Sequence, residues 1–221
     1  MNHFVKLRIE DKIPDLLLML SFYPVLTLGA RKLDKKDLQK PVAFFKQRGI
    51  EILKFNRGGG LTFHWPGQLV VYPILKLRKE EQHLSKFMYQ LEEVGLRTLK
   101  DLGINAERKR NKTAQIGLWH NEQKIASMGI AIFHWVTSYG FALNISGDFR
   151  MANYIRPCGL EAKLNTIENI LGFVPDREKV ISSLLSHFQI VFNRTVDNFM
   201  GKNISTNSLL LNQTQFQNSR K

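Results

Sequence analysis

Residues 57–77 read RGGGLTFHWPGQLVVYPILKL, and this stretch decides the fold. Three glycines follow Arg57, a lone His64 precedes a Pro-Gly turn, and an apolar run follows the turn. The run is rich in β-branched and aromatic residues, which predicts a strand. Pro73 predicts a bulge or an edge position in that strand, because proline cannot donate to a ladder. The glycines allow a close approach to the backbone, which suits a phosphate grip, an acyl-chain pocket or a simple tight turn.

On both sides of this stretch, short apolar runs alternate with amphipathic segments. The predicted strands cover 16–29 with a break at Pro24, 50–55, 116–120 and 124–133 as a hairpin, and 136–146. The predicted helices cover 80–102 and 176–195, with a part-helical segment at 34–49. Strands and hairpins with a few helices indicate an α+β or mixed α/β domain. We expect one domain over residues 1–198 and a polar, disordered tail over 199–221.

The composition narrows the class of partner and the compartment. The net charge is +13, from 32 basic and 19 acidic residues, which favours polyanions: nucleic acid, anionic membranes or acidic proteins. No nucleic-acid-binding fingerprint accompanies the charge, so we expect no nucleic acid partner. The uncharged run at 16–30 is too short to span a bilayer, and no secretory signal is visible, so we expect a cytoplasmic protein without a membrane partner. A single cysteine fits a reducing compartment.

Cys158 and Lys124 are the residues with candidate chemistry. Cys158 lies in RPCGL, between a rigid proline and a permissive glycine, whereas a core cysteine usually has apolar neighbours. It is either a small buried hydrophobe or a nucleophile, and a nucleophile needs a nearby cation or base that lowers the thiol pKa. Lys124 begins the apolar run IASMGIAI after a polar turn, so it either borders the core or points into water. His64 is structural or catalytic by the same reasoning.

Four ordered blocks resemble the lipoyl (octanoyl) transferase family. They are RGGGLTFHWPGQLVVYPILKL, then IGLW with KIASMGIAI, then GFALNISGD, then IRPCGL, and the resemblance covers about residues 24–160. It implies an α/β (α+β) fold with a mixed sheet packed with helices, like the catalytic domain of biotin and lipoate protein ligases. It also implies an octanoyltransferase of lipoate biosynthesis. Such an acyltransferase moves an octanoyl group from octanoyl-acyl carrier protein to a lysine of a lipoyl domain, through a cysteine thioester.

The same resemblance implies roles for individual residues. Cys158 matches the nucleophile, and Lys124 matches the lysine that lowers the thiol pKa and shuttles protons. The matching substrate-binding residues are Arg57, Gly58, Gly59, Gly60, Leu61, Thr62, Phe63, His64, Ser127, Met128, Gly129, Gly140, Phe141 and Ala142. The sequence departs from the family pattern at Asn56, Gly60, Trp65 and Tyr139, where Asp, Gln, Gly and His are usual.

The implied reaction sets the expected partners. The donor is octanoyl-acyl carrier protein, and the acceptors are lipoyl domains of 2-oxoacid dehydrogenases and the glycine cleavage H protein. Such partners are acidic, which suits a basic enzyme. We expect a monomer that needs no cofactor, neither ATP nor a metal. The alternatives are an ATP-dependent lipoate or biotin protein ligase of the same fold, a weakly active divergent copy, and a non-catalytic basic binding module, for example for RNA.

Overall fold

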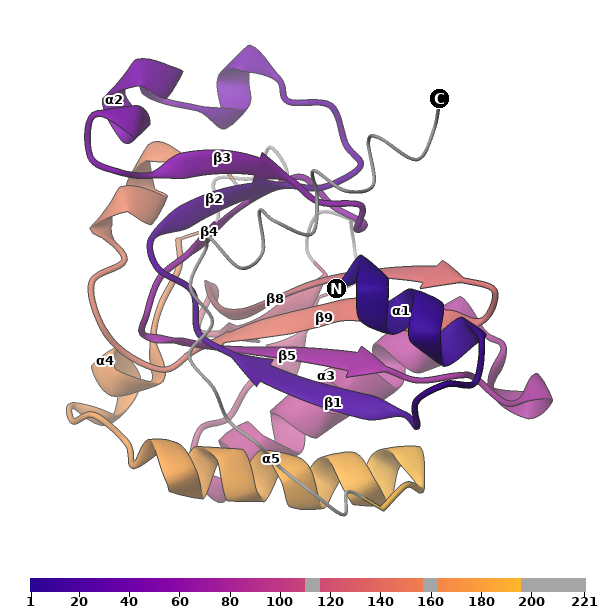
Figure 1. Ribbon diagram of the computed structural model, residues 1–221. Helices are drawn as coiled ribbons and strands as arrows, with labels where there is room; N and C mark the ends of the chain where they lie inside the picture. Colours follow the sequence, from indigo (N-terminus) through magenta and orange to yellow (C-terminus); the bar gives the residue numbers. More distant parts are fainter. Residues whose placement is uncertain (110–115, 157–162, 196–221) are drawn as a thin grey trace, which may run out of the picture.

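The part of the chain that the structure describes forms two β-sheets. The computed structural model describes residues 1–109, 116–156 and 163–195 (Figure 1). The larger sheet is antiparallel, with the order β1 (Leu16–Leu20), β5 (Gln68–Ile74), β9 (Val136–Asn144), β8 (Gln123–Phe133), β7 (Gly117–His120) and β6 (Glu107–Arg108). The smaller sheet has β2 (Val25–Leu28) in the centre, parallel to β3 (Glu51–Lys54) and antiparallel to β4 (Leu61–His64).

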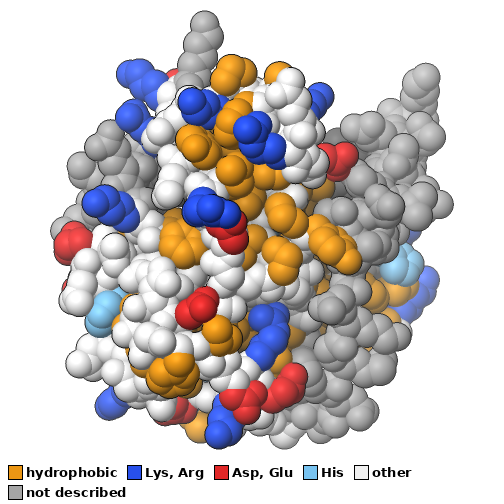
Figure 2. Space-filling model, turned by 90° about the vertical axis from the view of Figure 1, so that its left-hand side faces the viewer, with side chains coloured by type: hydrophobic (Ala, Val, Ile, Leu, Met, Phe, Trp, Pro, Cys, Tyr) orange, Lys and Arg blue, Asp and Glu red, His pale blue; other side chains and the backbone are white. Residues whose placement is uncertain are grey.

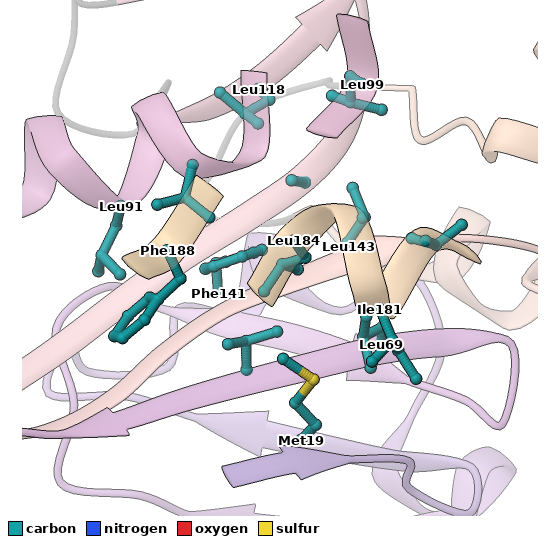
Figure 3. Packing of buried hydrophobic residues seen from close by; sticks show 14 of the residues in the cluster. Met19, Leu69, Leu91, Leu99, Leu118, Phe141, Leu143, Ile181, Leu184 and Phe188 are labelled. Atoms are coloured by element: carbon teal, nitrogen blue, oxygen red, sulfur yellow. The ribbon is translucent and has the colours of Figure 1, made fainter. Parts of the chain in front are cut away.

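Two long helices cover one face of the larger sheet. These are α3 (Leu84–Asp101) and α5 (Arg177–Phe192), and Figure 3 shows their apolar side chains against those of the strands. Leu69 and Val71 of β5 belong to this core, whereas Val70 and Tyr72 point to the opposite face, as the two-residue period of a strand requires. Each fully buried Leu or Phe contributes about 1.5–3 kcal/mol, so this layer fixes the larger sheet as a rigid platform.

The smaller sheet lies over the opposite face of that platform (Figure 1). It has its own core, which includes Leu26, Phe45, Leu61, Phe63 and Trp65. The remaining helical segments are α1 (Asn2–Ile9), α2 (Val42–Lys46), α4 (Ile167–Leu171), η1 (Lys35–Asp37), η2 (Lys79–Glu81) and η4 (Arg150–Tyr154). Within the described residues, no helix is both long and apolar enough to cross a membrane.

The predicted mixture of strands and helices is confirmed, although individual helices differ from the prediction and α4 was not predicted. The helix expected from residue 80 begins at Leu84, because residues 79–81 form a separate 3₁₀ turn in which the Glu81 carboxylate accepts from the Arg78 N–H. Helix α1 was not predicted, because its polar and apolar residues do not separate into faces. The tail at 199–221 lies outside the described residues.

Pro73 lies in an interior strand, so the expected edge position is wrong. Strand β5 pairs with β1 on one side and with β9 on the other. Its ladder to β9 runs from Gln68 to Val71 and is interrupted before the proline. Thr137 of β9 bridges the interruption, because its hydroxyl donates to the Pro73 carbonyl (2.8 Å) and accepts from the Leu75 N–H (3.0 Å). A side chain therefore supplies hydrogen bonds where the proline cannot.

Candidate active site

A cavity with an empty volume of about 290 Å³ lies between the larger sheet and the segment that carries the glycines. Its walls come from four separate segments, and the lining residues are Arg57, Thr62, His64, Val70, Tyr72, Ser127, Met128, Gly129, Gly140, Phe141 and Ala142. Most of the substrate-binding residues expected from the sequence therefore converge on one space, although they are up to 85 positions apart.

Strand alternation decides which expected residues reach this cavity. Thr62 and His64 of β4 line it, whereas Leu61 and Phe63 pack into the core of the smaller sheet on the other side. Gly58, Gly59 and Gly60 do not line it either. Sequence reasoning missed Val70 and Tyr72, which share one face of β5. Both faces of β5 are buried, so its sequence QLVVYPI shows no apolar–polar alternation that could have identified them.

The glycine stretch is held between β8 and residues 29–31. The Gly58 N–H donates to the Ile130 carbonyl of β8 (2.8 Å), and the Arg31 N–H donates to the Gly59 carbonyl (3.1 Å). A Cβ on Gly129 of β8 would come within 2.7 Å of the Gly58 carbonyl oxygen, so the strand needs glycine at this crossing. The glycines thus let two backbone segments of this protein pack directly against each other. This packing favours neither a phosphate grip nor a simple tight turn as the role of the glycine stretch.

Arg57 fixes this stretch to the smaller sheet. Its side chain is buried, and one guanidinium nitrogen donates to the Thr27 carbonyl (3.0 Å), the Thr27 hydroxyl (2.7 Å) and the Thr62 hydroxyl (2.9 Å). The other terminal nitrogen donates to the Gly58 carbonyl (3.0 Å). Because charge-assisted hydrogen bonds are stronger than neutral ones, Arg57 is a firm anchor for the glycine stretch.

His64 belongs to a buried chain of hydrogen bonds that crosses from the smaller sheet to the larger one. Its Nε2 lies 3.1 Å from the Thr27 hydroxyl, and its Nδ1 lies 2.9 Å from Gln68 Oε1. Gln68 Nε2 donates to Asn144 Oδ1 (2.9 Å), its cross-strand neighbour in β9. Asn144 Nδ2 then donates to the backbone carbonyls of Lys124 (3.3 Å) and Asn165 (3.0 Å).

These bonds have one consistent direction. Gln68 offers only its carbonyl oxygen to His64, so Nδ1 carries the proton and Nε2 accepts from the Thr27 hydroxyl. Burial, together with the nearby Arg57 charge, lowers the pKa of His64 to about 3. The imidazole is therefore neutral at physiological pH and is a positioning group here, not a general base. We refer to Arg57, Thr27, His64, Gln68 and Asn144 as the buried hydrogen-bond chain.

Replacing Asn144 with leucine should weaken the fold and the site together. The change removes the Asn144 amide that donates to the Asn165 carbonyl and accepts from Gln68, and buried unsatisfied groups cost about 1–3 kcal/mol each. We expect the free energy of unfolding, measured with urea, to fall by about 1–3 kcal/mol for each unsatisfied group. Activity per folded molecule should also fall, because the backbone of Lys124 loses a support. Thr98→Val is the control, since it removes a buried hydroxyl that bonds only its own helix. An equal loss of activity in both variants would contradict the prediction.

Lys124 is buried in β8, which excludes a lysine that points into water. Its Nζ lies 5.3 Å from the ring centroid of Trp119, its neighbour in β7, within the range of a cation–π contact. The side chain passes over Gly117, where a Cβ would stand 2.5 Å from the Lys124 Cε. Gly117 also has a φ of 141°, which side-chain-bearing residues rarely adopt. The GLW motif therefore creates the space that the lysine occupies.

Cys158 lies outside the described residues, but both flanks of its segment are well anchored. Before it, the Arg156 N–H donates to the Asp37 carbonyl (2.8 Å). After it, the Lys124 N–H donates to the Lys163 carbonyl (2.8 Å), and the Asn165 N–H donates to the Lys124 carbonyl (3.0 Å). The described residues that follow this segment, 163–165, therefore pair with the backbone of Lys124.

The departures from the family pattern have local structural reasons. Tyr139, at a φ of 59°, accepts a hydrogen bond from the Asn56 N–H (3.3 Å), so it supports the start of the glycine stretch. A Cβ on Gly60 would lie 2.7 Å from the Arg31 Nε, so glycine makes room for that arginine. Trp65 is buried, and its indole donates to the Ser146 carbonyl (2.7 Å).

Known proteins resemble this chain over most of its length. The model of the lipoyl protein ligase A/B catalytic domain matches residues 1–189. An octanoyltransferase from Caldicellulosiruptor bescii is 39% identical over 89% of this chain and 85% of its own length. One from Desulforamulus reducens is 35% identical over 85% of this chain and 81% of its own. Among solved structures, lipoate-protein ligase A bound with ATP has a TM-score of 0.73 at 15% identity, over 92% of this chain and 81% of its own, which shows a shared fold.

Proposed function

This chain belongs to the lipoyl protein ligase A/B catalytic-domain family. We propose a two-step mechanism for its activity as an octanoyltransferase of lipoate biosynthesis. Its substrates are an acyl carrier and a lipoyl domain. In the finer form of the proposal, octanoyl-acyl carrier protein is the donor. A lysine of the lipoyl domains of 2-oxoacid dehydrogenases, or of the glycine cleavage H protein, is the acceptor.

The first step forms an acyl-enzyme on Cys158. The thiolate attacks the thioester carbonyl of the donor, the new C–S bond forms, and the donor leaves as a thiolate that takes up a proton. One thioester replaces another, so the step is nearly balanced in energy. The buried ammonium of Lys124 stabilises the Cys158 thiolate and returns its proton to the leaving group.

The second step transfers the acyl group to the acceptor. The lysine amine of the acceptor attacks the acyl carbon, the C–N bond forms and the C–S bond to Cys158 breaks. The amine loses a proton to Lys124 or to the released thiolate. An amide replaces a thioester, so this step runs downhill. During both steps the acyl chain occupies the cavity, whose apolar walls include Val70, Met128 and Phe141.

One observation carries the proposal: three sequence blocks of the family pattern meet at one small cavity. Arg57 with His64, Ser127 to Gly129, and Gly140 to Ala142 all line it. The buried hydrogen-bond chain joins this cavity to the backbone of Lys124. An acyl pocket therefore lies in the same rigid unit as the proposed catalytic lysine.

A nucleotide-free transfer assay tests the function. The enzyme is mixed with octanoyl-carrier protein and a lipoyl domain, and the intact mass of the lipoyl domain is followed. We expect the acceptor to gain one octanoyl group without any nucleotide. An ATP-dependent ligase would instead need ATP and free octanoate. Transfer only under those conditions would overturn the proposal in favour of a ligase.

A further inference from the structure

We propose that residues 31–48 form a docking surface for the acidic carrier protein that delivers the acyl thioester. This inference rests on the proposed function and adds a place of contact to it. The segment comprises η1, α2 and the turns around them, at the outer side of the smaller sheet. We call it the basic surface.

The basic surface concentrates positive charge. Its sequence, RKLDKKDLQKPVAFFKQR, holds seven basic residues and two acidic ones, a much denser excess than in the chain as a whole. Asp37 is buried and paired with Arg31, so it offers little negative charge to a partner. Lys32, Lys36, Lys40 and Lys46 are exposed. None of these four lysines forms an ion pair with any other residue that the structure describes, so no described carboxylate neutralises their charges. The Lys40 Nζ lies 5.8 Å from the ring centroid of Phe44 and 5.7 Å from that of Tyr154.

Apolar side chains lie among these charges. Leu33 is 38% exposed and Val42 is 39% exposed, and the ring of Phe44 carries the Arg48 guanidinium at 3.8 Å. Figure 2 looks at the side of the molecule where α2 lies, and in its upper part blue Lys and Arg side chains surround orange ones. A basic rim with apolar spots suits an acidic protein surface better than a free small anion.

The basic surface contacts segments next to the candidate site at two points. At its start, the Arg31 N–H bonds the Gly59 carbonyl (3.1 Å), so the surface continues from the segment that borders the acyl cavity. Further along, the Gln39 N–H donates to the Tyr154 carbonyl (2.8 Å), and the Asp37 carbonyl accepts from the Arg156 N–H (2.8 Å). Cys158 follows Arg156 by two positions.

These two contacts favour the donor over the acceptor. The donor must insert its acyl chain into the cavity and also bring its thioester carbon to Cys158. A protein bound on the basic surface lies next to the cavity border and next to the lead-in to the cysteine. The acceptor meets an acyl chain that is already in the cavity, so it needs access only to the thioester.

Charge reversal with a matched control tests the proposal. The test variant carries Lys32→Glu, Lys36→Glu, Lys40→Glu and Lys46→Glu. The control carries Lys79→Glu, Lys86→Glu, Lys100→Glu and Lys179→Glu, which are exposed lysines of η2, α3 and α5. Both variants change the net charge equally. Each is assayed for acyl-enzyme formation from octanoyl-carrier protein and from octanoyl-pantetheine, a small uncharged thioester. Each is also pre-acylated with that thioester and assayed for transfer to a lipoyl domain.

We expect the test variant alone to lose about 10- to 1000-fold in kcat/KM with the carrier-protein donor, the range over which electrostatic steering acts. The kcat/KM of the test variant with this donor should also depend less steeply on salt concentration. Its rates with octanoyl-pantetheine and in transfer to the lipoyl domain should match those of the wild type. An equal fall in the control would overturn the proposal in favour of general charge steering. A loss confined to the second half-reaction would assign the surface to the acceptor. A wild type that forms no adduct with either thioester would instead contradict the proposed function.

Discussion

Cys158→Ser should abolish the acyl-enzyme and reduce octanoyl transfer by about 10³-fold or more. The wild type, mixed with octanoyl-carrier protein in the absence of an acceptor, should gain the mass of one octanoyl group. The serine variant should gain none, because a serine hydroxyl is a much weaker nucleophile than a cysteine thiolate at neutral pH. Intact-protein mass spectrometry measures both results.

The chain offers a clear control for this experiment. Because Cys158 is the single cysteine, any thioester adduct on the wild type must lie on it. Hydroxylamine, which cleaves thioesters, should remove the added mass. An adduct of the same mass on Cys158→Ser would move the acyl group to another side chain and would contradict the proposed nucleophile.

Lys124→Met should lower the rate of acyl transfer by about 10²- to 10⁴-fold, the usual contribution of a group that moves protons in a transition state. Methionine keeps the length and most of the volume of the buried stem, so the loss can be assigned to the ammonium. In the proposed mechanism the Lys124 ammonium lowers the thiol pKa, so its removal should raise that pKa towards about 8.5. This change in the thiol pKa is measured from the rate of alkylation of Cys158 between about pH 6 and pH 10, the window in which such a thiol titrates.

Two results decide whether Lys124 acts in this way. Lys163→Met is the matched control, because Lys163 is also a lysine but its side chain is exposed. Its backbone carbonyl accepts from the Lys124 N–H, and the substitution leaves that carbonyl in place. It should leave the alkylation curve unchanged. If Lys124→Met also left that curve unchanged while the protein stayed folded, the lysine would have no electrostatic role towards the thiol.

Sequence patterns were sufficient where a single period or motif settles the structure. The hairpin of β7 and β8, the helix α5 and its cap at Asp176 follow from alternation, helical spacing and capping chemistry. The resemblance indicated three of the blocks whose residues line the cavity. The order of strands β1-β5-β9-β8 brings those segments together.

Other features depend on register between distant strands, which one sequence does not specify. The pairing of Gln68 with Asn144 links residues 76 positions apart, and only the β5–β9 register makes it. Likewise, the resemblance implied only a substrate-binding role for Arg57. Its hydrogen bonds to Thr27 depend on the register between β2 and β4. Long-range pairing therefore determined what short-range patterns left open.

The one-way order of the buried hydrogen-bond chain also constrains any redesign of this protein. Each member donates towards the next, so a single replacement leaves a neighbouring donor or acceptor without its partner. Its members should therefore tolerate replacement only in compatible pairs. Val70 and Tyr72 stand outside that unit and still face the cavity. Redesign for a longer or shorter acyl chain should therefore begin with Val70 and Tyr72 and keep the five residues of the buried hydrogen-bond chain.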